Sequence, residues 1–174
     1  SDVYKRQAPC IEEDGRTFEE NAIKKATVIS RYTCKFALAD DSGLEVEALG
    51  GRPGIYSSRY AGEKSTYAEN NRKLLSELSL IKGKKRRACF RCVMVLASPR
   101  GEVRTTEGRI DGTIAEELRG ESGFGYDPLF IVPSYNKTFA ELGPEIKNRI
   151  SHRALALKKI REILLHDFLS GSLL

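Results

Sequence analysis

The chain has 174 residues, of which 40% are hydrophobic and 30% charged, and Lys and Arg outnumber Asp and Glu by 29 to 24. This composition is that of an ordinary globular domain, and it excludes collagen-like, low-complexity and disulfide-scaffold proteins. Because no apolar stretch approaches about 18 residues, the sequence predicts no membrane span. A net charge of +5 suits an anionic ligand such as a nucleotide, but it does not by itself predict one.

The first third of the chain predicts a helix followed by two short strands. Thr17 begins a capping box and apolar residues follow at helical spacing, so we expect a helix from Thr17 to about Arg31. Residues 36–39 form a short apolar run that ends in two aspartates, as a buried strand does at a site. Residues 44–49 alternate in polarity and predict a second, half-exposed strand. The glycine-rich segment 50–54 is predicted to be a loop.

A second capped helix and a hairpin follow. A capping box at Thr66 begins a helix whose predicted buried stripe is Leu74, Leu75, Leu78 and Ile81. Residues 88–97 and 102–110 predict the two strands of a hairpin. Residues 129–132 predict a further strand.

Two helices end the chain. The capping box at Thr138 begins a short helix that Gly143 and Pro144 should end, and Ser151 can cap a last helix that runs to about Leu165. Helices mixed with strands predict the α/β (mixed) class, with a mixed sheet.

Two local patterns favour structural roles. The basic run in residues 82–87 is either a nucleic-acid patch or a solvated loop, and the loop is favoured because no aromatic side chains interleave to stack bases. Cys89 and Cys92 form a C-x-x-C pattern inside a predicted strand, where an offset of three places them on opposite faces. We therefore expect reduced, inert thiols rather than a zinc or redox site.

Residues 39–44 (ADDSGL) are the first candidate for chemistry. Neighbouring strand residues point in opposite directions, so one of Asp40 and Asp41 should face a site while the other supports the backbone. Carboxylate oxygens suit Mg²⁺, which binds one or two carboxylates together with substrate phosphates. A simple turn at a strand end explains the segment equally well. Gly43 permits a turn or a close approach.

Two further segments carry candidate binding residues. In residues 123–128 (GFGYDP), two glycines bracket Phe124, whose ring offers a flat face for a base. Taken alone, a tight turn with a core Phe is the better explanation. In the cluster of Lys147, Ser151, His152 and Arg153, the cations suit phosphate or base contacts, although an exposed basic helix start explains them too. The sequence has no phosphate-binding P-loop, zinc spacing or nucleophile elbow.

Together these segments resemble one family, the noncanonical purine nucleoside triphosphate pyrophosphatases of the inosine/xanthosine triphosphate type. The resemblance covers about residues 13–165 and rests on five segments in order: 17–22 (TFEENA), 39–44 (ADDSGL), 50–62 (GGRPGIYSSRYAG), 123–128 (GFGYDP) and 147–153 (KNRISHR).

The resemblance implies an activity and an architecture. Enzymes of this type cut ITP, dITP and XTP between the α and β phosphates, giving the monophosphate and pyrophosphate, and so clean the nucleotide pool. It further implies a long twisted mixed sheet with flanking helices, two lobes around a central cleft, Mg²⁺ dependence, a cytoplasmic homodimer, and no membrane or nucleic-acid partner.

The resemblance also implies roles for individual residues. Asp41 would be the general base and a metal ligand, Glu20 the second metal carboxylate, and Asp40 a supporting catalytic residue. Glu20 has a competing explanation, because in a capping box it would reach back to the Thr17 amide. The implied substrate contacts are Ser42, Phe124, Gly125, Tyr126, Asp127, Lys147, His152 and Arg153.

The N-terminus departs from the family pattern. Residues 1–12 match none of it, and the phosphate-binding Asn and Lys loop that normally precedes the first capped helix is missing, so residues 13–170 are predicted to form the single pyrophosphatase-like domain. We therefore expect lower stability and activity than in a relative that has that segment. Two other functions stay open: a catalytically impaired purine-nucleotide binder, and a nucleic-acid binder that uses residues 84–87.

Overall fold

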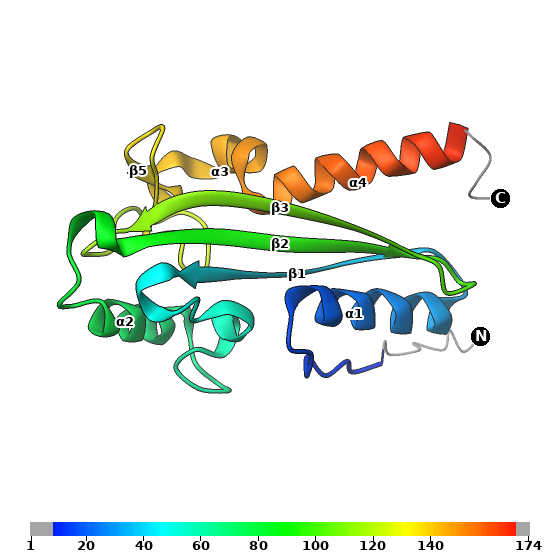
Figure 1. Ribbon diagram of the computed structural model, residues 1–174, viewed down its shortest axis with the longest axis horizontal. Helices are drawn as coiled ribbons and strands as arrows, with labels where there is room; N and C mark the ends of the chain where they lie inside the picture. The colour runs from blue at the N-terminus through cyan, green and yellow to red at the C-terminus, as the bar shows by residue number, and fades with distance from the viewer. Residues whose placement is uncertain (1–8, 170–174) are drawn as a thin grey trace, which may run out of the picture.

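The computed structural model describes residues 9–169, so the predicted separate segment 1–12 lies mostly outside it. Five antiparallel strands form one sheet in the order β1-β2-β3-β4-β5. They are β1 (Ala37–Val46), β2 (Arg87–Ala97), β3 (Val103–Ile114), β4 (Phe130–Val132) and β5 (Lys137–Thr138). The α/β class with a long sheet and flanking helices is confirmed (Figure 1). Every pairing between the described strands is antiparallel, where the sequence predicts mixed pairing.

Helices lie on both faces of this sheet (Figure 1). They are α1 (Phe18–Thr33), α2 (Tyr67–Glu77), α3 (Phe139–Ile150) and α4 (His152–Leu169), with short 3-10 helices η1 (Glu47–Leu49), η2 (Gly54–Arg59) and η3 (Gly83–Arg86). The predicted helices and the 88–97 hairpin are therefore confirmed, with the last helix longer than expected. No helix among residues 9–169 has the length and apolar character needed to span a membrane.

The two faces of the long strands have separate cores because strand side chains alternate. On one face Val93, Val95 and Ala97 pack against Phe18, Ala22 and Ala26 of α1. On the other face Cys92, Met94 and Leu96 pack against Ala156 and Ile160 of α4. A third and larger hydrophobic cluster, at the end of the sheet where β4 lies, joins β1, α2, β4 and α3. It contains Leu44, Leu74, Phe130 and Phe139. The sheet thus holds α1 and α4 on opposite sides of the same strands.

The prediction of two strands separated at Asp40 and Asp41 is wrong. β1 runs through both aspartates and pairs with β2 in unbroken register from Ala37↔Ala97 to Val46↔Ala88. Gly43 makes no turn there. A Cβ at Gly43 would lie 2.4 Å from the Gly54 carbonyl oxygen, so glycine serves the close approach of the 50–62 segment. Residues 47–49 form η1 instead of continuing the predicted second strand.

Helix ends follow the predicted capping with two differences. The boxes at Thr66 and Thr138 are complete, with Glu69 and Glu141 returning to the cap amides. At Thr17 the hydroxyl accepts the Glu20 amide at 3.1 Å, but the Glu20 carboxylate accepts the Arg16 amide instead of the Thr17 amide. The break predicted after Thr138 does occur at Gly143, whose φ is +74°, yet the chain resumes a helical path to Ile150.

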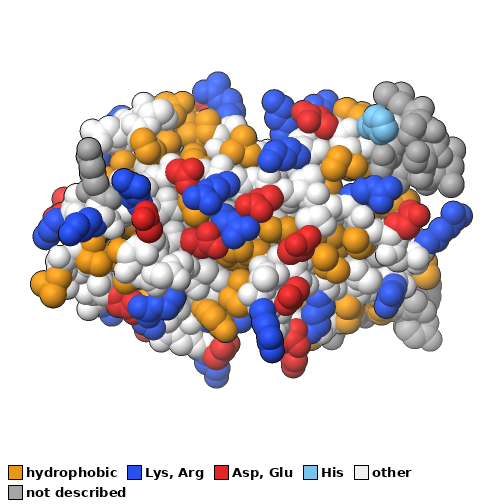
Figure 2. Space-filling view, viewed as in Figure 1, with side chains coloured by type: hydrophobic (Ala, Val, Ile, Leu, Met, Phe, Trp, Pro, Cys, Tyr) orange, Lys and Arg blue, Asp and Glu red, His pale blue; other side chains and the backbone are white. Residues whose placement is uncertain are grey.

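The basic run does not form one solvated surface, because Arg86 is buried. Its guanidinium donates hydrogen bonds to four carbonyl oxygens, those of Leu78, Ile81, Ile114 and Ala115. This side chain ties the end of α2 to the end of β3. The nucleic-acid reading of residues 84–87 therefore loses one of its four cations to the core. Figure 2 shows acidic and basic side chains interspersed over the viewed face rather than gathered by sign.

The two cysteines of the C-x-x-C pattern are free, buried and on opposite faces of β2. The Cys89 thiol contacts Glu45, while the Cys92 thiol contacts Asp40. Burial raises the pKa of each thiol to about 11. Both are thus protonated at neutral pH, as expected for inert thiols.

Candidate active site

Asp41 lies at the centre of a buried polar cluster between β1 and α1. Its side chain faces α1, where Asn21 and Lys25 lie four residues apart and so share one helix face. Asn21 Nδ2 donates to Asp41 Oδ2 at 3.1 Å, and Lys25 Nζ donates to Asp41 Oδ1 at 2.9 Å. Asp41 is only 8% exposed. Burial raises the pKa of its carboxyl, and the contacts with Lys25 and Asn21 oppose that rise.

A second carboxylate, Glu13, joins this cluster from the segment before α1. Its Oε1 accepts from Lys25 Nζ at 3.0 Å, so one ammonium group contacts both Glu13 and Asp41. Arg59 of η2 donates to the Glu13 carbonyl oxygen at 3.2 Å and fixes the backbone there. Burial lowers the pKa of Lys25, but the two carboxylates outweigh it and leave the pKa above its ordinary value. Lys25 is therefore charged at neutral pH.

Asp40 points to the opposite face of β1. Arg153 of α4 donates to Asp40 Oδ2 from Nε at 3.1 Å and from Nη2 at 2.9 Å, and the Ser42 hydroxyl donates to the same oxygen at 2.8 Å. Burial raises the pKa of Asp40, but Arg153 outweighs it and the pKa lies below the ordinary value. Asp40 is thus a fixed anion that holds Arg153 rather than a partner of Asp41.

A cavity of about 700 Å³ opens beside Arg153 between α4, α3 and the 122–124 loop. Phe124 lies at its wall and is half exposed. The Lys147 ammonium lies 4.2 Å from the centroid of the Phe124 ring, and the Arg153 guanidinium lies 5.9 Å from it. An aromatic face with two cations beside it is a surface suited to an electron-rich, anionic ligand such as a nucleotide.

His152 forms part of the inner wall of this cavity. Its ring stacks on Phe90 at a centroid distance of 4.7 Å, and its Nδ1 is buried without a hydrogen-bond partner in the described residues. Burial, together with the nearby Arg153 and Lys147, lowers the pKa of His152 to about 3. The ring is therefore neutral at physiological pH. A neutral ring can accept or donate a hydrogen bond and does not act as a charged acid.

Gly125, Tyr126 and Asp127 shape the loop instead of lining the cavity. The Asp127 carboxylate accepts the Phe124 amide at 2.9 Å and forms an ion pair with Lys147. The Tyr126 hydroxyl donates to the Ser57 carbonyl oxygen at 2.9 Å, and the ring is buried. These contacts hold the loop so that Phe124 remains at the cavity wall.

Glu20 is not among the hydrogen-bond or ion-pair partners of the Asp41 cluster in the described residues. Its carboxylate is exposed and accepts the Arg16 amide at 2.7 Å. The structure brings Asp41 together with Glu13, Lys25 and Asn21, none of which was a predicted site residue. The spacing of Asn21 and Lys25 on one helix face opposite the aspartates was the available signal. Glu13 precedes the helix and has no motif of its own.

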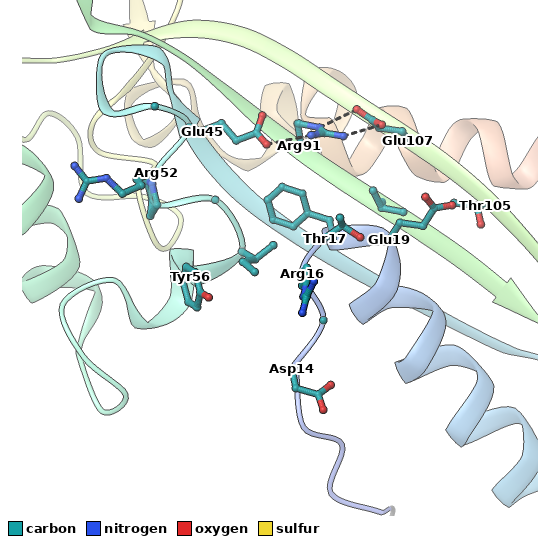
Figure 3. Close-up of a pocket in the computed structure, with 18 of the residues that line it drawn as sticks. Asp14, Arg16, Thr17, Glu19, Glu45, Arg52, Tyr56, Arg91, Thr105 and Glu107 are labelled. Atoms are coloured by element: carbon teal, nitrogen blue, oxygen red, sulfur yellow. Dashed lines mark hydrogen bonds and ion pairs between the residues drawn. The ribbon is translucent and has the colours of Figure 1, made fainter.

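A larger groove of about 1050 Å³ lies between the start of α1 and the 50–56 segment (Figure 3). Arg91 on its floor pairs with Glu45 at 3.0 Å and with Glu107 at 3.0 Å. This cation is already neutralised, and the groove shares no residue with the Asp41 cluster or the Phe124 cavity. This groove is therefore separate from the two candidate sites described above.

The sequence profile of the Ham1 family matches residues 2–163. The chain belongs to the Ham1 family. It is 58% identical over 154 residues to a protein named dITP/XTP pyrophosphatase from Desulforamulus reducens, a match that spans 88% of this chain and 77% of the relative. A protein of the same name from Bacillus subtilis is 54% identical over 154 residues, spanning 88% and 78%.

Solved structures of the family share the fold. A HAM1 protein from Coxiella burnetii superposes with a TM-score of 0.86 at 46% identity, covering 91% of this chain and 82% of that one. The Ham1 protein of Staphylococcus aureus gives a TM-score of 0.82 at 47% identity, covering 94% and 81%.

Proposed function

We propose that this chain hydrolyses noncanonical purine nucleoside triphosphates (dITP, ITP and XTP) to the monophosphate and pyrophosphate. The single observation that carries the proposal is its identity of more than 50% with several dITP/XTP pyrophosphatases over most of their length. The geometry supports it independently. A base-sized aromatic cavity lies on one side of β1, and a carboxylate cluster with a lysine lies on the other.

The two sites are joined through consecutive residues of β1. Arg153 contacts both the cavity and Asp40, and Asp41 is the next residue along the strand. β1 is the outermost strand of the described sheet, so its outer edge is the short route between the faces. A nucleotide with its base on Phe124 would pass its phosphates over Arg153 and Asp40 toward Asp41.

The donor set of Glu13 and Asp41 fits a magnesium ion. Both are carboxylates and both lie within 3.0 Å of one ammonium group, so their oxygens already face a common cation. No group of three or more His, Cys, Asp or Glu within residues 9–169 is arranged to hold a metal. Two carboxylates completed by water and substrate phosphates is the arrangement that Mg²⁺ prefers. These two carboxylates would hold Mg²⁺, which would supply positive charge against the charge that develops on the phosphates.

The chain's own residues supply the remaining chemistry. Asp41, with its pKa raised by burial, accepts a proton from the attacking water. Lys25 keeps the Asp41 carboxylate oriented and adds positive charge beside the phosphates. On the base side, Phe124 stacks on the purine, and neutral His152 offers a hydrogen bond to its edge. Lys147 and Arg153 supply the charge-assisted contacts.

A pyrophosphate-release assay tests the activity. We expect release from dITP, ITP and XTP with Mg²⁺, much less from GTP and ATP, and none after chelation of the metal. Purine nucleotide binding without pyrophosphate release would instead assign the chain as an impaired nucleotide binder. Release of inorganic phosphate alone would contradict cleavage between the α and β phosphates.

Glu13 and Glu20 are distinguished by their magnesium response. Glu13→Gln keeps an acceptor for Lys25 but removes a charge from the cluster, so we expect the half-saturating Mg²⁺ concentration to rise at least about tenfold. Glu20→Gln is the matched control and should leave that concentration unchanged, because Glu20 holds only the Arg16 amide. A shift in Glu20→Gln with none in Glu13→Gln would return the metal to Glu20, the ligand that the sequence predicts.

Three predictions of the resemblance concern the assembly and its context. Pairing of two copies, a cytoplasmic location and the absence of a nucleic-acid partner all stay predictions. The predicted start of the domain at residue 13 is likewise still a prediction.

A further inference from the structure

We propose that α2 sets the affinity for the base by positioning Phe124 through Asn71 and Tyr67. The proposal rests on the proposed nucleotide pyrophosphatase function and adds two positioning residues to it. Neither residue lines the cavity beside Phe124. Both act through the 123–127 loop, which α2 contacts at Phe124 and Gly125.

Asn71 holds the loop by its backbone. Its Nδ2 donates to the Gly125 carbonyl oxygen at 3.0 Å, which links two residues 54 positions apart in the chain. Gly125 has a φ of +60° and Gly123 one of +84°, so the peptide units around Phe124 follow a path that few other residues adopt. This hydrogen bond therefore constrains the carbonyl of Gly125, the residue that directly follows Phe124.

The stability of the fold does not account for Asn71. The side chain is only 5% exposed, and its Oδ1 has no hydrogen-bond partner in the described residues. A buried acceptor without a partner opposes folding and offsets much of the gain from the bond to Gly125. The Asn71 amide is thus better explained by a role in positioning the Gly125 carbonyl than by a contribution to the stability of the fold.

Tyr67 supports the Phe124 ring itself. It lies one turn before Asn71 on the same face of α2, and its ring centroid is 6.3 Å from that of Phe124 at an interplanar angle of 42°. Both rings are more than half exposed, so the pair forms an aromatic surface at the mouth of the cavity. Tyr67 limits the positions that Phe124 can take when no base is bound.

Asn70 is a matched control, because it is the adjacent buried asparagine on the same helix. Its Nδ2 donates to the Ser58 carbonyl oxygen, and its Oδ1 accepts the Ala61 amide and the Ser65 hydroxyl. All its partners lie in residues 58–65, and none of them belongs to the 123–127 loop. Asn70→Ala should therefore reduce the melting temperature more than Asn71→Ala while leaving nucleotide affinity unchanged.

The experiment measures kcat and KM for dITP, together with inhibition by tripolyphosphate, which has no base. We expect Asn71→Ala to raise KM about five- to tenfold with kcat within twofold of wild type. The inhibition constant of tripolyphosphate should not change. Tyr67→Ala should raise KM in the same way, and Tyr67→Phe should restore it because the ring is kept. Since Tyr67 is exposed, its variants are expected to fold.

The outcomes separate this proposal from the function on which it rests. Wild-type KM in both Asn71→Ala and Tyr67→Ala overturns the α2 proposal and leaves the pyrophosphatase function intact. An equal loss of tripolyphosphate inhibition also overturns it, because the damage then extends beyond the base. A wild-type chain that neither binds nor cleaves dITP overturns both.

Discussion

Asp41→Asn should lower kcat for dITP by about 10²- to 10⁴-fold, the contribution typical of a general base. The substitution keeps the shape of the side chain but removes the group that accepts the proton from water. It also removes the negative charge that faces Lys25 across 2.9 Å. Pyrophosphate release under saturating dITP and Mg²⁺ measures the effect. A melting curve checks that the variant is folded.

Asp40→Asn is the matched control, since it makes the same change at the adjacent residue on the opposite face of β1. Asp40 holds Arg153 by two hydrogen bonds, so removing the negative charge of Asp40 should weaken substrate binding through Arg153. We expect a raised KM with a smaller fall in kcat than in Asp41→Asn. Equal losses of kcat in the two variants would mean that the strand as a whole, and not Asp41, carries the effect.

The opposite directions of Asp40 and Asp41 were predictable, because strand geometry alone requires them. Their partners were not. Lys25 and Arg153 lie 16 residues before Asp41 and 113 residues after Asp40, and nothing local identifies them as the counter-charges. The same counter-charges explain why β1 was wrongly divided. Without known counter-charges, two adjacent aspartates predict the end of a buried strand. Lys25 and Arg153 compensate them here, so the strand continues.

Residues of the loop 123–127 show a second limit of sequence reasoning. The pattern marks the whole segment as a binding loop, yet only Gly123 and Phe124 of these five residues line the cavity. Tyr126 and Asp127 are buried and hold the loop through Ser57 and Lys147. A sequence motif therefore contains both residues that face a ligand and residues that orient them. Only the packing in the structure distinguishes these two groups.

Gly108→Ala should destabilise the fold by about 3 kcal/mol or more, because the added methyl group would meet helix backbone. Gly108 lies on β3 beneath the first turn of α4. A Cβ there would lie 1.9 Å from the His152 carbonyl oxygen and 2.5 Å from the Ala156 amide nitrogen. Neither atom belongs to a flexible side chain, so α4 as a whole must move away from the sheet. Ala156, which is fully buried against Cys92 and Met94, would then lose packing.

For a chain of this size such a loss corresponds to a fall in melting temperature of roughly 6–12 °C. Thr105→Ala on the same strand is exposed and should change the melting temperature by far less. Movement of α4 also displaces His152 and Arg153, which line the Phe124 cavity. The variant should therefore show a raised KM for dITP at temperatures where it is still folded. A melting temperature like that of Thr105→Ala would contradict the close packing of α4 on β3.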